Sequence, residues 1–236
     1  MRVVGAERER AVAETTDSLA AYDLVLRGRE KLRRRSARSN IEARRFFEDA
    51  ITLDPNYAPA HVGLADTHRN DFLFGWTEWP EQALQKVRES AERALKLDQN
   101  SARAHSLLGS AHGFLNRHDL AEAALTRAKR LNPNDPQVYA DLGVFLTWSG
   151  RPRDAIEPLE TARRFDPTID PSWADLGAAY FLTGRQEQAI TVLEDGLSRH
   201  PERTYAHIVL AAAYADSGRL DDAKRSAENV RRLHPF

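Results

Sequence analysis

The sequence predicts an all-α fold in which pairs of helices repeat along the chain as a solenoid. The first observation is a period of 34 residues, marked by a proline near the end of each unit: Pro133, Pro167, Pro201 and Pro235. Periods of this length are typical of repeat proteins. A leucine and the small residue after it keep the same period, at Leu108-Gly109, Leu142-Gly143, Leu176-Gly177 and Leu210-Ala211. The second observation is that apolar residues recur at spacings of three and four, as on one face of a helix.

Each unit is expected to contain a first helix, a turn and a second helix. If a unit is numbered so that its proline stands at position 32, apolar residues occupy positions 4, 7, 8 and 11, and then 20, 24 and 27. Gly150, Gly184 or Gly218 lies between the two stripes, and glycine suits the left-handed end of a helix. Pro152 suits the first turn of a second helix, whereas the proline at position 32 ends that helix.

Two less regular units precede the four regular ones. The first is marked by Gly28, Lys31, Ala43, Phe47, Ala50 and Pro55, with three extra residues. The second is marked by His61, Leu64, Ala65, His68, Ala91 and Ala94, with about ten extra residues between its helices. We therefore expect repeats at approximately residues 21–57, 58–101, 102–135, 136–169, 170–203 and 204–236. Residues 1–20 are expected to form an N-terminal connector that is helical or frayed.

One unit carries a known family pattern almost complete. Its residues are Trp173, Leu176, Gly177, Tyr180, Ala189, Leu193, Gly196 and Pro201, with Gly196 where the family has alanine. This pattern resembles the tetratricopeptide repeat. The resemblance implies a right-handed superhelical solenoid of about six helix-turn-helix units, whose first helices line a concave surface that binds proteins or peptides.

A narrower resemblance concerns the less regular residues 5–30 and 71–79. They are similar to the C-terminal tetratricopeptide region of bacterial class III adenylate cyclases and of related winged-helix transcriptional regulators. The resemblance implies a regulatory or sensory tail in bacterial signalling. The cyclase or DNA-binding head of such a regulator is not among these 236 residues.

Composition argues against several other classes. The chain has 34 Lys and Arg residues against 35 Asp and Glu residues, and its hydrophobic content of 42% is enough for a buried core. The absence of cysteine excludes disulfides and thiol catalysis. No apolar run reaches the roughly 20 residues that a membrane-spanning helix needs. Because the charged start does not resemble a secretory signal, we expect a cytoplasmic protein.

The sequence offers no motif for catalysis or for metal binding. Seven of the eight histidines occupy packing positions of the repeat or directly precede its proline, and the HExxH spacing is missing. Neither a nucleophile elbow nor a phosphate-binding glycine loop occurs. We therefore expect a protein that is not an enzyme and that needs no cofactor or metal.

The surface best suited to a partner is a stripe on the first helices at positions 2, 5, 9, 12 and 13, roughly opposite the packed face. Its expected members are Val62, Asp66, Arg103, Ser106, Ser110, Phe114, Gln137, Val144, Thr147, Trp148, Ala174, Ala178, Phe181, Leu182, Tyr205, Ile208, Ala212 and Asp216. The large apolar members predict a trough for a protein or peptide, since exposed aromatic residues often mark binding surfaces. Under the alternative interpretation, these side chains pack against neighbouring helices and expose only their edges.

The lysine and asparagine of a chaperone-binding carboxylate clamp are missing from positions 5 and 9. A chaperone C-terminus is therefore not an expected ligand.

The insert of the second unit is expected to be a loop from Asp71 to Glu81, and it contains four aromatic residues: Phe72, Phe74, Trp76 and Trp79. A loop with four large aromatic side chains seldom stays fully solvated. We favour a lid that buries these rings on the first two repeats, and the alternative is one lip of the trough.

A basic cluster lies in the first unit, where residues 27–45 contain nine basic and two acidic residues. Its central members are Arg33, Arg34, Arg35 and Arg38. We favour a solvated helix face, because charge runs on helices are usually solvated. The alternative is contact with an acidic protein or with nucleic acid, the latter disfavoured because no aromatic residue is interleaved. Homodimerisation, and occupation of the trough by residues 1–18, stay open.

Overall fold

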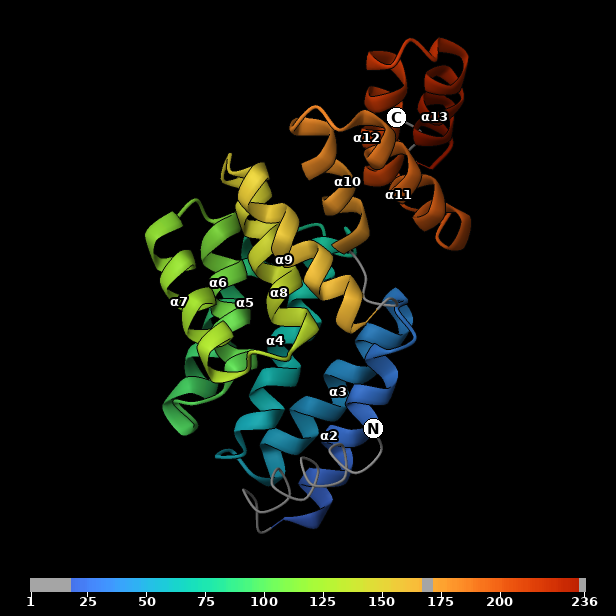
Figure 1. Cartoon of the computed structure of the whole chain (residues 1–236). Coiled ribbons are helices and arrows are strands. Elements are labelled where there is room, and N and C mark those ends of the chain that lie inside the picture. The colour runs from blue at the N-terminus through green and yellow to red at the C-terminus, as the bar shows by residue number, and fades with distance from the viewer. Residues whose placement is uncertain (1–17, 167–171, 234–236) are drawn as a thin grey trace. The chain divides into compact units, whose positions relative to one another are not determined.

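The computed structural model describes residues 18–166 and 172–233, which divide into two compact units within residues 1–131 and 132–236. Every regular element in these described ranges is a helix (Figure 1). The twelve helices of the described ranges form six helix-turn-helix pairs, so the predicted all-α fold is confirmed. Residues 1–17 of the expected N-terminal connector lie outside the described residues.

The described part of unit 1, residues 18–131, contains three helix pairs. They are α2 (Leu19–Leu32) with α3 (Ala37–Leu53), α4 (Ala58–Leu73) with α5 (Pro80–Leu97), and α6 (Ala102–Phe114) with α7 (His118–Leu131). Each first helix packs on its own second helix, and α4 also packs against α2 and α6. The first helices of unit 1 therefore lie side by side.

Unit 2 repeats this arrangement with three further pairs. They are α8 (Pro136–Trp148) with α9 (Pro152–Phe165), α10 (Ser172–Leu182) with α11 (Gln186–Arg199), and α12 (Thr204–Asp216) with α13 (Leu220–Leu233). The first helix α10 packs against both α8 and α12. A stripe on these three helices is therefore one continuous surface of unit 2.

Polar caps and glycine turns fix where the helices begin and end. Ser36 caps α3 in a reciprocal arrangement with Ser39, and Asp135 caps α8 by accepting a hydrogen bond from the Gln137 N–H at 3.0 Å. Such caps satisfy backbone donors that have no partner within the helix. The predicted left-handed turns occur at Gly150 and Gly184, whose φ angles are +80° and +78°.

The glycine at position 8 lets the two helices of a pair approach closely. A Cβ atom on Gly143 would lie 2.3 Å from Leu159 Cγ, and one on Gly177 would lie 2.5 Å from Leu193 Cγ. Both leucines are fully buried. The leucine of the second helix thus fills the place that a side chain on the first helix would take.

Gly196, which stands where the family pattern has alanine, is explained by its neighbour. A Cβ on Gly196 would lie 2.1 Å from Cε3 of Trp173. The indole of Trp173 is buried, so α11 needs a glycine at the point of contact. One large residue on the first helix is therefore balanced by the smallest residue on the second.

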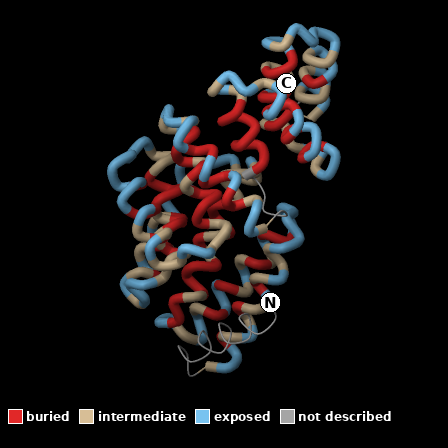
Figure 2. Tube along the Cα trace, viewed as in Figure 1, coloured by how far each residue is buried: buried red, intermediate tan, exposed pale blue. Residues whose placement is uncertain are grey.

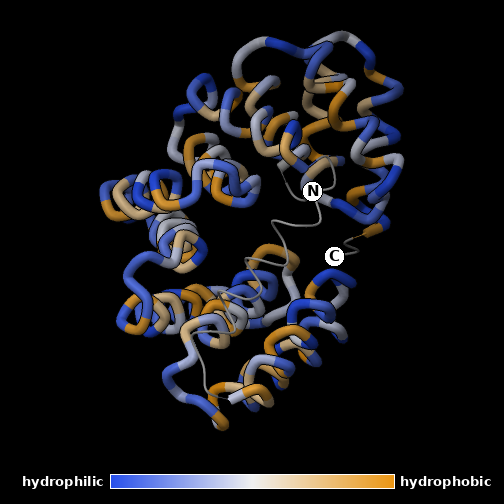
Figure 3. The backbone as a smooth tube through the Cα atoms, turned by 60° about the horizontal axis from the view of Figure 1, so that its bottom comes forward, coloured by the Kyte–Doolittle hydropathy of each residue, from blue (hydrophilic) through white to orange (hydrophobic). Residues whose placement is uncertain are grey.

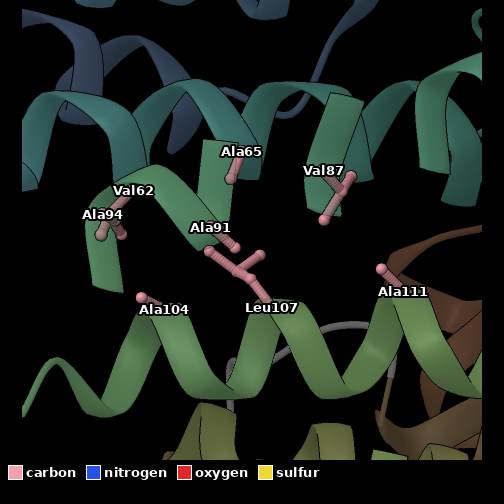
Figure 4. Packing of buried hydrophobic residues seen from close by; sticks show 8 residues of the cluster. All are labelled: Val62, Ala65, Val87, Ala91, Ala94, Ala104, Leu107 and Ala111. Atoms are coloured by element: carbon pink, nitrogen blue, oxygen red, sulfur yellow. The ribbon is translucent and has the colours of Figure 1, made fainter. Parts of the chain in front are cut away.

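The core consists of alanine-rich layers between consecutive helices. In unit 1, Leu107 of α6 lies between alanines of α4, α5 and α6 (Figure 4). Buried positions recur along one side of the helices, while turns and outer faces are exposed (Figure 2). This periodic burial is what the spacings of three and four predict.

The loop formed by the insert of the second repeat is shorter than expected. The sequence predicts an irregular segment from Asp71 to Glu81, but α4 continues to Leu73 and α5 begins at Pro80. The Asn40 side chain of α3 donates hydrogen bonds to Asp71 Oδ1 at 2.8 Å and to the Thr67 carbonyl at 2.9 Å. These contacts stabilise an extra turn of α4, so only residues 74–79 connect the two helices.

Hydrophobic and hydrophilic residues alternate along the helices of each unit (Figure 3). Within the described ranges, none of the helices combines the length and the apolar character needed to cross a membrane.

Candidate functional site

The apolar surface expected on the first helices is most developed in unit 2. We call it the unit 2 stripe, and its members are Gln137, Val144, Thr147, Trp148, Ala174, Ala178, Phe181, Leu182, Tyr205, Ile208, Ala212 and Asp216. Three large apolar residues on it are exposed: Trp148 by 60%, Leu182 by 57% and Ile208 by 51%. They come from α8, α10 and α12, so three neighbouring helices each present one apolar side chain to solvent.

The floor of the unit 2 stripe is made of small buried residues. Ala174 and Ala178 of α10 are buried, and Thr147 of α8 is buried with its hydroxyl donating to the Gly143 carbonyl at 2.9 Å. Phe181 and Tyr205 are half-buried between this floor and the exposed residues. The interpretation that all these side chains only pack internally therefore holds for the floor and not for the exposed rim.

A polar contact orients the indole of Trp148. Its Nε1–H donates a hydrogen bond to Asp175 Oδ1 over 3.1 Å. The Tyr205 ring lies beside it, with 5.6 Å between ring centroids and 35° between ring planes. Asp175 is only 4% exposed, whereas most of Trp148 remains in solvent. The carboxylate, the indole and the phenol thus form one compact cluster contributed by α10, α8 and α12.

The electrostatics of this cluster are set by burial. Burial raises the pKa of the Tyr205 hydroxyl, and the negative charge of Asp175 raises that pKa further. Tyr205 is therefore a neutral phenol at physiological pH. The cluster offers a partner two aromatic rings next to a carboxylate.

Sequence spacing did not single out Asp175. It occupies position 6 of its repeat, beside the positions assigned to the stripe. The sequence feature that could have indicated Asp175 is a repeated Asp-Leu-Gly, since Asp141 occupies the same position in the preceding repeat. Asp141 is buried too, and it accepts a hydrogen bond from Gln137 Nε2 at 2.9 Å.

The corresponding residues of unit 1 are engaged within the unit. Arg103 makes a two-point contact with the Asp66 carboxylate, and Arg69 lies 3.7 Å from the same group. Val62, Ser106 and Ser110 are buried. The structure thus gives this part of the predicted site a polar, internally paired character.

The aromatic residues of the insert pair with one another and with the stripe. Phe72 lies beside Phe114, with 4.7 Å between ring centroids, and Phe74 and Trp76 are separated by the same distance. The four rings of these two pairs are half-buried. Trp79 is 62% exposed. The insert therefore brings one predicted lip residue, Phe72, to the predicted stripe residue Phe114.

The four arginines of the basic cluster are exposed around the turn between α2 and α3. Arg33 pairs with Glu30 and Arg38 pairs with Glu42, each at 3.3 Å. A hydrogen bond from Lys31 lowers the pKa of the Glu42 carboxyl. Part of the positive charge is thus compensated along the same two helices.

Histidines at position 4 contact the preceding turn. The Nε2–H groups of His61 and His207 donate to the carbonyls of Pro55 and Pro201, each at 3.0 Å. The described residues contain no group of three His, Asp or Glu side chains that could hold a metal ion.

Sequence reasoning also missed a set of tyrosine contacts between consecutive repeats of unit 2. The Tyr180 hydroxyl donates to Glu160 Oε1 at 2.5 Å, and Tyr214 makes the same contact with Glu194. Burial, followed by these carboxylates, raises the pKa of each tyrosine to about 12. The sequence feature that could have indicated these contacts is a glutamate 20 residues before each tyrosine.

Comparison with known proteins agrees with this architecture. Models of the tetratricopeptide repeat match residues 102–135, 170–213 and 204–229. A protein of Rhizobium meliloti (strain 1021) described as "Putative adenylate cyclase 3" is 29% identical over 124 residues. That alignment covers 52% of this chain but only 21% of the relative. The chain therefore spans about a fifth of the length of this relative.

Solved structures share the fold at low identity. A chain of the APC/C hetero-tetramer Cut9–Hcn1 aligns over 95% of this chain and 42% of that chain, with a TM-score of 0.72 and 22% identity. PilW, a type IV pilus biogenesis factor, aligns over 76% of this chain and 78% of its own, with a TM-score of 0.62 and 21% identity. Residues 102–135 and 170–229 therefore consist of tetratricopeptide repeats, and the other helix pairs have the same helix-turn-helix form.

Proposed function

We propose that the chain is a non-catalytic protein-interaction scaffold that binds a peptide or a helix of another protein on the unit 2 stripe. The observation that carries this proposal is the trio of exposed apolar residues Trp148, Leu182 and Ile208 on three neighbouring helices. The hydrogen bond to Asp175 and the packing of α8 on α10 hold Trp148 in place, so little conformational entropy of this side chain is lost when a partner binds.

The gain from covering Trp148 is large for one residue. A tryptophan side chain buries roughly 150–250 Å² when it is fully covered, and 60% of this residue is exposed. At about 25 cal/mol per Å² of apolar area, covering the exposed part contributes ~2–4 kcal/mol before other costs of association. This is the size expected of a binding hot spot.

Selection from a random peptide library on the immobilised full chain tests the proposal without a known partner. Peptides that bind the wild type are expected to be lost with Trp148→Ala and retained with Leu220→Ala. Leu220 is a matched control because it is 60% exposed and lies on α13, outside the stripe. Peptides that bind the Trp148→Ala variant as well as the wild type would contradict the proposal.

A second candidate is a regulatory module of an adenylate cyclase or a transcriptional regulator. The observation that favours it is the alignment of about half of this chain with a relative described as a putative adenylate cyclase. In this case the partner on the stripe would be a segment of the regulator itself. Binding of this chain to a purified cyclase or DNA-binding head encoded with it, and loss of that binding with Trp148→Ala, would support this function. A lack of binding would oppose it.

A further inference from the structure

We propose that the segment recognised by unit 2 is both apolar and basic, and that a lysine or arginine of it sits on the exposed face of the Trp148 indole beside Asp175. This inference rests on the function proposed above and specifies the chemistry of the partner. It excludes acidic segments and purely apolar ones as preferred ligands.

The geometry around Trp148 suits a cation. The hydrogen bond to Asp175 holds the indole by its N–H edge, while the ring remains 60% exposed. A cation over an indole face is attracted by the negative potential of the ring, and tryptophan is the best aromatic residue for this contact. The adjacent carboxylate acts in the same direction, and its burial weakens screening by water. Both features favour positive charge at the same place.

The charge distribution of the unit 2 stripe agrees with this geometry. Among the residues that make up the stripe none is Lys or Arg, and the one charged member is Asp216. Residues 132–236 as a whole contain 12 Lys and Arg residues against 16 Asp and Glu residues, a net charge of −4. A positively charged segment is therefore attracted and an acidic one repelled.

Position 2 of the repeat differs between the two units. In unit 1, position 2 of the third repeat is Arg103, which is paired with Asp66 of the preceding repeat. In unit 2, position 2 of the last repeat is Tyr205, an uncharged aromatic residue next to Trp148. Position 2 beside the stripe thus carries a cation in unit 1 and an uncharged aromatic ring in unit 2.

The exposed neighbours specify the rest of the segment. Leu182 and Ile208 project from α10 and α12, so apolar side chains next to the cation can be covered in the same complex. The stem of a lysine or arginine is itself apolar and can lie along an aromatic ring. An amphipathic helix whose apolar face is flanked by basic residues fits this combination.

Three designed peptides test the inference by calorimetric titration of the full chain. They share one 14-residue amphipathic leucine pattern and carry lysine, glutamine or glutamate at the flanking positions. We expect the lysine peptide to bind about tenfold more tightly than the glutamine peptide, and the glutamate peptide to bind more weakly than either. Equal affinity for the lysine and glutamine peptides would overturn the inference.

Asp175→Asn locates the effect, because the amide oxygen can still accept the indole hydrogen bond while the charge is lost. This variant is expected to reduce the preference for the lysine peptide several-fold. Asp221→Asn removes the same charge from unit 2 at an 88% exposed side chain of α13 and is expected to leave the preference unchanged. Equal effects of the two variants would mean that only net charge matters and would also overturn the inference.

A rim variant keeps the test independent of the buried carboxylate. Leu182→Lys places a cation on the exposed rim and is expected to weaken binding of the lysine peptide more than binding of the glutamine peptide. Leu182→Gln should weaken binding of both peptides equally. If the lysine and glutamine peptides bind equally and both need Trp148, the proposed function stands and the cationic specificity fails. If neither peptide binds, or if Trp148→Ala has no effect on either, the proposed function fails as well.

Discussion

The close approach of helices in unit 2 gives a prediction whose size can be derived from the structure. In Gly177→Ala, the new Cβ would lie 2.5 Å from Leu193 Cγ and 2.6 Å from Leu193 Cδ2. Overpacking of this kind costs about 3 kcal/mol at a rigid site, and the better helix propensity of alanine returns about 1 kcal/mol. We therefore expect the free energy of unfolding of unit 2 to fall by about 2 kcal/mol.

A double-mutant cycle separates this steric cause from other effects. Leu193 is fully buried, so Leu193→Ala alone should cost about 3–4 kcal/mol, the usual loss for such a cavity. In the double variant, the methyl group introduced by Gly177→Ala occupies part of the space that the leucine leaves. The combined loss should therefore be about 2 kcal/mol smaller than the two separate losses predict.

Urea unfolding followed by tryptophan fluorescence measures these values. Trp76 and Trp79 of unit 1 should be replaced by phenylalanine in every variant, so that Trp148 and Trp173 report on unit 2 alone. Additive losses, or a Gly177→Ala variant as stable as its parent, would refute the explanation of glycine at position 8.

Three further predictions concern pH and charge. Burial raises the pKa of the fully buried Tyr57 from 10.0 to about 12, so the stability of the fold should be lost as the pH rises from about 10 towards 12. Thermal unfolding of Tyr57→Phe should show a smaller loss of stability over that range, and an unchanged loss would contradict the prediction. Burial lowers the pKa of His61 below its ordinary value of 6.5. The stability that the neutral His61 contributes should therefore be present above about pH 6.5 and lost as the pH falls through the lower pKa of the folded state. In acid denaturation, His61→Gln should reduce this loss. For the basic cluster, we expect no binding of a 20-nucleotide single strand at physiological salt, measured by fluorescence anisotropy; steeply salt-dependent binding that disappears when Arg33, Arg34 and Arg38 are replaced by alanine would instead support the nucleic-acid alternative.

The sequence was sufficient for the all-α repeat fold because the signals for its helices and turns depend on local chemistry. Gly150 and Gly184 supply the left-handed turns that stop the first helices, and a proline-marked period of 34 residues sets the length of each pair. Such signals act over a few residues and need no knowledge of distant contacts. The six helix pairs follow from them.

The insert and the Asp175 cluster depend on tertiary contacts that spacing does not contain. Asn40 of α3 holds Asp71, which prolongs α4 beyond the end predicted from the pattern. Asp175 is buried between apolar neighbours at a position next to the predicted stripe, and only the contact with Trp148 of another helix reveals its orienting role. Helical periodicity assigns a residue to a face, but it does not say which side chain of the next helix lies opposite.

The same limit applies to the predicted stripe as a whole. Positions 2, 5, 9, 12 and 13 are equivalent by spacing in both units. In unit 1, however, Arg103 pairs with Asp66, whereas in unit 2 Trp148, Leu182 and Ile208 remain exposed. The difference comes from the particular side chains at equivalent positions, and it is what directs the proposed binding site to unit 2.

The dissociation constant of one library-selected peptide for Trp148→Ala, compared with Leu220→Ala, tests the central claim most directly. If the unit 2 stripe binds the partner, Trp148→Ala should weaken the peptide at least tenfold, which corresponds to about 1.4 kcal/mol. Leu220→Ala should leave the constant unchanged, with both variants retaining the helical circular dichroism of the wild type. Equal constants for the two variants would contradict the claim that this surface is the binding site.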